Sequence, residues 1–206
     1  MHKASVGRKT MLRFIIVRPG QTEIDEQGRI KGNLDVPLTA SGTTQVRQTA
    51  DELNTVRFDA IYTGPCLAAR QTAEQLANVS GKRSKVVDLF RNLDLGLWNG
   101  RRIEELKETQ PRVYRQWQDH PETVCPPGGE TLEDAQQRLR KALLKIVKRR
   151  KHGTVVLVLM EPLASIASSL LLSKEIGDLW KAETDCGSYE SIDLEPQLLA
   201  TDLNQS

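Results

Sequence analysis

Ile15-Ile16-Val17-Arg18-Pro19-Gly20-Gln21-Thr22 is the stretch from which the fold can be read. An apolar run, residues 14–17, ends at a charged residue, a proline and a glycine, as expected of a buried strand that stops at a tight turn. In open α/β sheets, ligands collect where the strands end. The guanidinium of Arg18 is therefore expected in a pocket, where it suits a planar anion such as phosphate or carboxylate. Pro19 beside it offers neither an N–H nor a reactive side chain.

The composition fits a single α/β domain. The chain has 206 residues, a formal net charge of +2 and 4% aromatic residues. This length suffices for a sizeable core, and the charge commits the chain to no class of partner. Residues 12–195 are expected to form the domain, between a flexible tail at residues 1–11 and a second tail at residues 196–206. The first tail is polar and basic without an apolar segment, so no secretory signal is expected.

The sequence predicts neither a membrane span nor a metal site. It contains no run of about 18 or more apolar residues, the length that a spanning helix needs. Its three cysteines are scattered and form no Cys-x-x-Cys pair. This pattern favours a reducing cytoplasm over a disulfide framework or a zinc site. We therefore expect a cytoplasmic protein without a cofactor or metal.

Strand and helix signals alternate along the chain. A polar loop is expected over residues 23–33, followed by a helix that Thr39 caps and that runs to about Leu53. The longest apolar run, residues 155–159, indicates a central strand covered on both faces. The other expected strands are 58–62, 85–89 and an edge strand within 186–194. The other expected helices are 66–77, 103–109, 112–120, 131–148 and 163–172.

Five blocks carry a family resemblance, at residues 18–22, 28–39, 62–73, 91–100 and 126–131. The second block, Gly-Arg-Ile-Lys-Gly-Asn-Leu-Asp-Val-Pro-Leu-Thr, is the longest near-verbatim match. In this order the blocks resemble the signatures of the histidine phosphatase superfamily, the phosphoglycerate-mutase-like proteins. The resemblance implies a three-layer α/β/α sandwich with a mostly parallel central sheet.

The same resemblance implies that the reactive positions are replaced. Family members begin with Arg-His-Gly-Glu-Thr, and the His accepts the phosphoryl group, so Pro19 occupies the place of the nucleophile. In the later blocks, Ala68 stands where the family has a second phosphate-binding Arg, and Asn92 stands where it has a proton-donating Glu. After the apolar run 155–159, where the family continues with Ser-His-Gly, Glu161 stands at the second His. An amide cannot protonate a leaving group. No catalytic residue of the family is therefore expected to be intact.

Part of the substrate-binding set is retained. Arg70 does not replace the Arg expected at Ala68, because two residues along a helix amount to roughly 200° of rotation. The surviving loops, residues 28–39 and 126–131, indicate that a cleft persists. The substrate-binding residues that the resemblance implies are Arg18, Gly20, Lys31 and Gly32.

Glu161 is expected to oppose the family's usual ligand. A carboxylate ~4 Å from a phosphate charge is repelled by about 4 kcal/mol at an effective dielectric constant of 20. Glu161 also precedes an expected helix, and helix N-termini favour anions. We therefore expect its carboxylate to pair with Arg18 and to fill the site in place of phosphate.

The sequence supports one function and leaves two alternatives open. The first is a pseudo-phosphatase with a binding or regulatory role, whose partner is a small anionic ligand or a protein. An alternative is a phosphomonoesterase or phosphoglycerate-mutase-type enzyme with a rearranged active site, for which Cys66 and Glu161 are the candidate nucleophiles. The other is a basic-surface module in which residues 145–151 bind nucleic acid or anionic lipid, although a solvated helix end explains that run better. Oligomerisation is left open.

Overall fold

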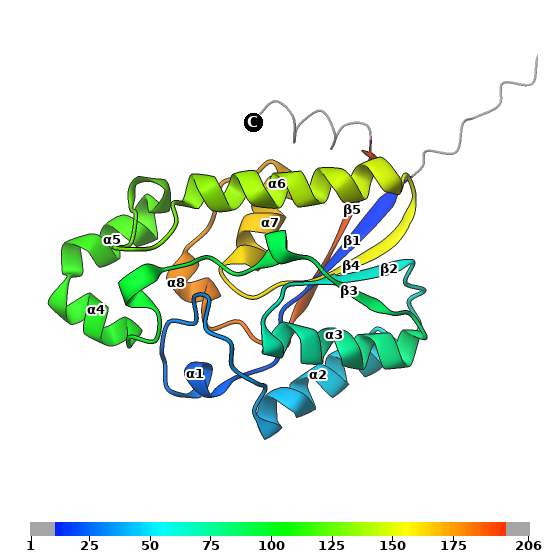
Figure 1. The fold of residues 1–206 in the computed structure, drawn as a ribbon, viewed down its shortest axis with the longest axis horizontal. Coiled ribbons are helices and arrows are strands. Elements are labelled where there is room, and N and C mark those ends of the chain that lie inside the picture. Colours follow the sequence, from blue (N-terminus) through cyan, green and yellow to red (C-terminus); the bar gives the residue numbers. More distant parts are fainter. Residues whose placement is uncertain (1–10, 197–206) are drawn as a thin grey trace, which may run out of the picture.

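The computed structural model describes residues 11–196, so the predicted terminal tails lie almost entirely outside the described residues. Within this part of the chain, a five-stranded sheet lies between two layers of helices (Figure 1). The strands are β1 (Leu12–Val17), β2 (Ala60–Thr63), β3 (Ser84–Val86), β4 (Gly153–Val158) and β5 (Tyr189–Leu194). The helices are α1 (Glu23–Glu26), α2 (Ala40–Glu52), α3 (Leu67–Ser80), α4 (Ile103–Thr109), α5 (Pro111–Asp119), α6 (Leu132–Arg149), α7 (Leu163–Leu172) and α8 (Leu179–Ala182), with 3-10 turns η1 (Asp88–Phe90), η2 (Gly96–Trp98) and η3 (Pro121–Thr123).

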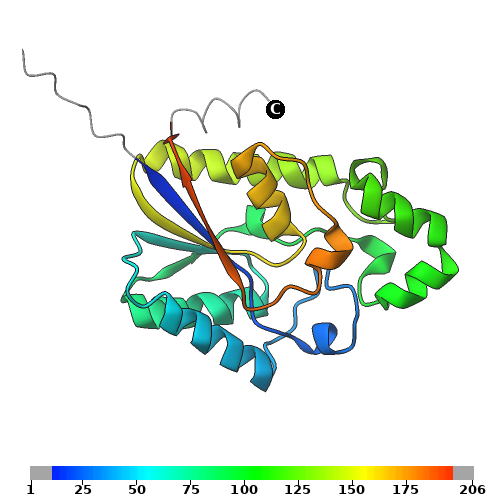
Figure 2. The same ribbon diagram turned by 180° about the vertical axis from the view of Figure 1, so that it is seen from behind.

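The sheet has the order β3-β2-β4-β1-β5. Every neighbouring pair is parallel except β1 and β5, which are antiparallel (Figure 2). The predicted central strand is β4, and its residues 155–158 are all buried because helices cover both faces of the sheet. The predicted edge strand is β5. The mostly parallel α/β/α sandwich is thus confirmed.

Alternation along β1 divides its side chains between two cores. Phe14 and Ile16 pack into the core beneath α6 and α7. Ile15 and Val17 pack into the core beneath α2 and α3, on the other face. A strand buried on both faces reads as the continuous apolar run that the sequence contains.

A third apolar cluster supports the segment that leads into the functional site. Trp98 and Trp117 meet edge to face, with their ring centroids 5.6 Å apart, and Trp180 of α8 lies 6.0 Å from Trp98. The indole N–H of Trp180 donates to the backbone carbonyl of Tyr114 at 3.0 Å. These contacts fix α8, and with it the residues between α8 and β5.

Two predicted segments differ from the observed ones. Residues 23–33 are not loop throughout, because the helical turn α1 begins after Thr22. The backbone N–H of Thr22 donates to Asp25 at 2.7 Å, a reciprocal cap that a Thr-x-x-Asp sequence permits. The strand expected at 85–89 ends at Val86, and η1 follows at once. The cap at Thr39 is confirmed, since its hydroxyl accepts from the N–H of Gly42 at 3.1 Å.

Candidate functional site

Arg18 and Glu161 meet at the carboxyl edge of the sheet. Arg18 directly follows β1, and Glu161 lies three residues after β4, which pairs with β1 in parallel. Parallel strands that are neighbours end at the same edge, so residues that follow them lie close together. The backbone N–H of Arg18 donates to the carbonyl of Ser188 at 2.9 Å, which ties this edge to the segment before β5.

The predicted pair between Arg18 and Glu161 is confirmed. Nε of Arg18 donates to Oε1 of Glu161 at 2.5 Å, and only 1% of Glu161 is exposed. The second oxygen, Oε2, accepts the backbone N–H of Ser165 in the first turn of α7 at 3.1 Å. The carboxylate therefore bridges a guanidinium and a helix N-terminus, both of which favour anions.

Two further carboxylates approach Arg18 from the segment around the start of β5. Nε lies 3.2 Å from Oδ2 of Asp185, and Nη2 donates to Oε1 of Glu190 at 3.0 Å. The sequence analysis missed both residues. Glu190 lies in the predicted edge strand and pairs in register with Ile16, but no motif indicated that its side chain reaches Arg18.

Burial and pairing act against each other in these groups. Burial raises the pKa of Glu161 above its ordinary range, while Arg18 and Ser165 act to lower it. Burial disfavours the charged form of Arg18, but Glu161, Glu190 and Asp185 more than offset this and raise its pKa. Because three carboxylates surround Arg18, its charge is neutralised within the protein.

Pro19 and Gly20 are packed tightly beside this pair. The carbonyl of Pro19 accepts the backbone N–H of Gly187 at 2.8 Å. A Cβ added to Gly20 would collide with the backbone of Gly42 in the first turn of α2. Residues 19 and 20 are thus held between α2 and the segment before β5, where only a glycine fits at position 20.

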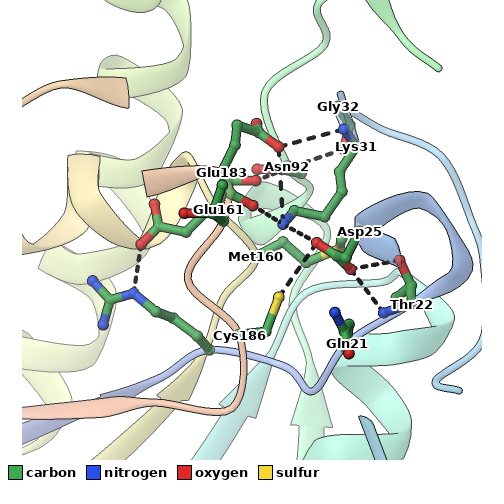
Figure 3. A network of polar contacts seen from close by, with 12 residues as sticks. Gln21, Thr22, Asp25, Lys31, Gly32, Asn92, Met160, Glu161, Glu183 and Cys186 are labelled. Atoms are coloured by element: carbon green, nitrogen blue, oxygen red, sulfur yellow. Dashed lines mark hydrogen bonds and ion pairs between the residues drawn. The ribbon is translucent and has the colours of Figure 1, made fainter. Parts of the chain in front are cut away.

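Lys31, predicted to bind substrate, is committed to internal partners (Figure 3). Only 4% of it is exposed, and Nζ lies 2.5 Å from Oδ1 of Asp25 and 3.9 Å from Oε2 of Glu183. It also donates to the backbone carbonyl of Glu183. Burial disfavours the charged forms of Lys31 and Asp25. The carboxylates of Glu183 and Asp25 more than offset this and raise the pKa of Lys31, while Lys31 and Thr22 lower the pKa of Asp25.

Glu183 is the least satisfied group in this part of the molecule. Burial raises its pKa to about 7, although Lys31 opposes that shift. Its Oε1 is buried and has no hydrogen-bond partner among residues 11–196. Asp25 lies closer to Lys31 than Glu183 does, so Glu183 is the carboxyl that gains most from holding a proton. We call the seven charged residues described so far the ion-pair cluster: Arg18, Asp25, Lys31, Glu161, Glu183, Asp185 and Glu190.

Asn92 connects the loop at Gly32 to the start of α7 (Figure 3). Its Nδ2 donates to the carbonyls of Gly32 and Glu161, each at 2.7 Å, and its Oδ1 accepts the N–H of Leu163 at 3.3 Å. Both donor hydrogens of the amide are used, and a carboxylate has none to offer. Asn92 is thus a buried crosslink.

The prediction that a cleft persists is wrong for the space beside Arg18 and Glu161. The space between Pro19, Lys31, Glu161 and Cys186 has a volume of only about 10 Å³. Roughly 10–15 Å³ of such volume is needed to hold one water molecule. The side chain of Glu161 and the segment after α8 occupy the rest, so a phosphate does not fit without displacing them.

Ala68, Arg70 and Cys66 lie at the start of α3. Ala68 is fully buried, whereas Arg70 is exposed, which confirms that Arg70 points away from position 68. Burial raises the pKa of Cys66 to about 11. Its sulfur lies 2.8 Å from Sδ of Met160. A thiol with this pKa is protonated at neutral pH, which makes it a poor nucleophile.

Within residues 11–196, the structure shows neither a metal-binding group of side chains nor a disulfide. No group of three or more His, Cys, Asp or Glu residues is placed to hold a metal ion. No helix of this part is long and apolar enough to cross a membrane. Cys66, Cys125 and Cys186 are all free thiols.

Several known proteins are similar to this chain in sequence and in fold. The sequence profile of the histidine phosphatase superfamily (branch 1) matches residues 14–203. The chain is 30% identical to phosphoserine phosphatase 1 of Hydrogenobacter thermophilus, over 90% of this chain and 88% of that protein. It is 28% identical to a probable phosphoglycerate mutase of Salmonella choleraesuis, over 72% and 69% of the two chains. The native structure of a mycobacterial glucosyl-3-phosphoglycerate phosphatase superposes with a TM-score of 0.78 at 25% identity, over 89% of this chain and 90% of that one.

Proposed function

This chain belongs to the histidine phosphatase superfamily, and we propose that it is a pseudo-phosphatase, a member that binds or regulates instead of transferring phosphoryl groups. The resemblance of its first block puts Pro19 at the place of the phosphoryl-accepting His. A proline side chain has no atom that can attack phosphorus. The phosphoryl transfer of the family would therefore lack its nucleophile in this chain.

The contact between Glu161 and Arg18 is the observation that carries this proposal. The carboxylate accepts a hydrogen bond from Nε of the guanidinium at 2.5 Å and so competes with any other anion for Arg18. Asp185 and Glu190 add two more negative charges within 3.2 Å. A phosphate brought to ~4 Å from any one of them meets about 4 kcal/mol of repulsion at an effective dielectric constant of 20. Binding of the family's ligand at this position is thus opposed by both charge and space.

The role that remains is binding, and its partner is a protein or a small anion that docks away from the ion-pair cluster. We place the protein in the cytoplasm, because three free thiols suit a reducing compartment. The fold and the tightly paired cluster support a stable scaffold for such a role.

A phosphomonoesterase with a rearranged site is the competing proposal. The names of the relatives, phosphoserine phosphatase and probable phosphoglycerate mutase, favour it. The geometry opposes it, because Glu161 is already paired with Arg18 and Ser165. The thiol of Cys66 is partly buried, and because its pKa is raised to about 11 it is protonated at neutral pH.

The test is phosphatase turnover on a panel of phosphomonoesters that begins with phosphoserine. The native protein is compared with P19H and with a fourfold variant, P19H/A68R/N92E/E161H, after urea unfolding has shown that each variant folds. We expect turnover only in the fourfold variant, because Glu161 still occupies Arg18 in P19H. Turnover by the native protein that is lost in C66S or E161Q would overturn the proposal.

A further inference from the structure

A second pocket, none of whose lining residues belongs to the ion-pair cluster, lies between α6 and the edge strand β3. Figure 1 shows where these two elements lie in the fold. Its volume is about 310 Å³, within the range of roughly 300–1,000 Å³ that is typical of sites for small molecules. We call it the α6–β3 pocket. Its walls are largely apolar and are formed by Tyr62, Val86, Val87, Leu89, Ala142 and Ile146.

Three cations and one acid complete the lining. Lys85 is in β3, and Lys145 and Arg149 lie one turn apart on α6. Asp88 is the only acidic residue among the described residues that line the pocket. All three cations are exposed, and none of them forms an ion pair with another of the described residues. By contrast, the buried cations Arg18 and Lys31 are paired. The pocket thus has a surplus of unneutralised positive charge beside apolar walls.

We propose that the α6–β3 pocket binds a small amphiphilic anion, with an apolar chain or ring system against the walls and a carboxylate, sulfonate or phosphate group at Lys85, Lys145 and Arg149. The apolar part of the ligand would cover Val86, 45% of which is exposed. The anionic group would meet lysine and arginine donors that have no carboxylate partner among residues 11–196. This site is separate from Arg18, so it does not depend on the function proposed above.

Charge argues against a second copy of this chain as the occupant. The outer edge of β3 is unpaired in the described sheet, so another β3 could add to it. In an antiparallel pairing of the three residues Ser84–Val86 with themselves, Lys85 would stand opposite Lys85. Like charges directly opposite each other are destabilising. An anionic ligand instead relieves the charge of Lys85.

The pocket can be tested with the fluorescent anion 8-anilinonaphthalene-1-sulfonate, titrated into the full-length native protein. Competition is then measured with decyl phosphate, with inorganic phosphate and with decyltrimethylammonium. We expect saturable binding of one probe per chain, displaced by decyl phosphate. The other two competitors should be ineffective, because one lacks the chain and the other has the wrong charge.

Two double variants provide the decisive comparison. K145E/R149E reverses both α6 cations of the pocket and should weaken probe binding at least tenfold. K141E/K148E makes the same change of net charge at exposed positions of α6 outside the pocket lining, and it should leave the affinity within about twofold. Both double variants should unfold at the same urea midpoint, so that a difference in affinity does not reflect a difference in folding. V86S, which changes an apolar residue of the pocket wall, should also weaken probe binding.

Three outcomes would overturn the proposal. The first is equal weakening by both double variants, because it would indicate a general charge effect. The second is binding to vesicles of phosphatidylglycerol without binding of monomeric decyl phosphate, which would indicate a membrane surface. The third is a dimer in light scattering that K145E/R149E dissociates, because the pocket would then be an interface between copies of the chain.

Discussion

Arg18 and Glu161 are 143 residues apart in the sequence, yet Nε of one lies 2.5 Å from Oε1 of the other. The parallel pairing of β1 with β4 brings them together, since each follows its strand at the same edge of the sheet. This edge is where an α/β protein ordinarily presents a ligand site. Here a carboxylate of the chain occupies it.

Replacing Arg18 by alanine should strongly destabilise the fold. It would leave Glu161, 1% exposed, as an unpaired buried carboxylate. Breaking a buried ion pair by removing one partner costs about 3–5 kcal/mol. The measurement is the free energy of unfolding in urea. The cost should be smaller in mild acid, because Glu161 can then take up a proton.

Arg13 provides the matched control for this prediction. It lies in the same strand and pairs with Asp193 at 2.7 Å, but both side chains are nearly half exposed. Exposed pairs contribute roughly 0–1 kcal/mol, so R13A should change stability little. Equal effects of R13A and R18A would show that the buried pair contributes no more to the free energy of unfolding than the exposed pair does.

Glu183 should make the protein less stable as pH rises from about 5 to about 8. Burial raises its pKa from 4.5 to about 7, so in this range the folded state holds a proton that the unfolded state releases. The contribution is fully present below the unfolded pKa and is lost as pH rises through the folded pKa. At most it amounts to about 3 kcal/mol.

The variant E183Q isolates this effect. Glutamine cannot titrate, so relative to the native protein it should gain stability as pH rises over the same range. Urea unfolding at several pH values measures the difference, and E175Q, at an exposed glutamate, serves as the control. Parallel pH profiles for the native protein and E183Q would contradict the assignment.

Asn92 should be a structural residue whatever the function of the chain. N92A would remove three hydrogen bonds and leave the carbonyls of Gly32 and Glu161 without this donor. An unsatisfied buried group costs about 1–3 kcal/mol, so we expect a loss of at least ~2 kcal/mol in urea unfolding. N54A, at an exposed asparagine, should be nearly neutral. A neutral N92A would mean that water replaces the amide.

Gly20 should tolerate no side chain. In G20A the new Cβ would collide with the backbone of Gly42, which cannot move without shifting α2. Overpacking of this kind typically costs about 1–3 kcal/mol. G177A adds the same methyl group where nothing lies within 4 Å, so its melting temperature should stay close to that of the native protein.

The fold could be predicted from the sequence because its signals are local or repeat over a short range. The apolar run 155–158 is buried on both faces, and the caps at Thr39 and Thr131 begin α2 and α6. The pair between Arg18 and Glu161 could also be predicted, since both residues follow strand-like runs. It stays a prediction that the family's catalytic positions are occupied here by Pro19, Ala68, Asn92 and Glu161.

The rest of the site could not be read from the sequence. Glu183 and Asp185 reach the cluster through the packing of α8 and the segment before β5, and Glu190 reaches it through the pairing of β5 with β1. No periodicity of the sequence encodes these placements. The prediction of a cleft beside Arg18 and Glu161 was wrong, because the volume that packing leaves there depends on side chains from four separate segments. Lys31 lay in a recognised motif, but its burial against Asp25 and Glu183 became visible only in three dimensions.

The carboxylates around Arg18 also constrain the order in which substitutions can accumulate. If Glu161 is replaced first, Arg18 keeps Asp185 and Glu190 as partners and remains neutralised. If Arg18 is replaced first, Glu161 keeps only the uncharged donors of Ser165, among residues 11–196, against its buried charge. The effect of replacing one residue of the pair on stability therefore depends on which residue is replaced first. Substitution of Glu161 while Arg18 stays in place should therefore be tolerated, whereas substitution of Arg18 first should pass through a protein of low stability.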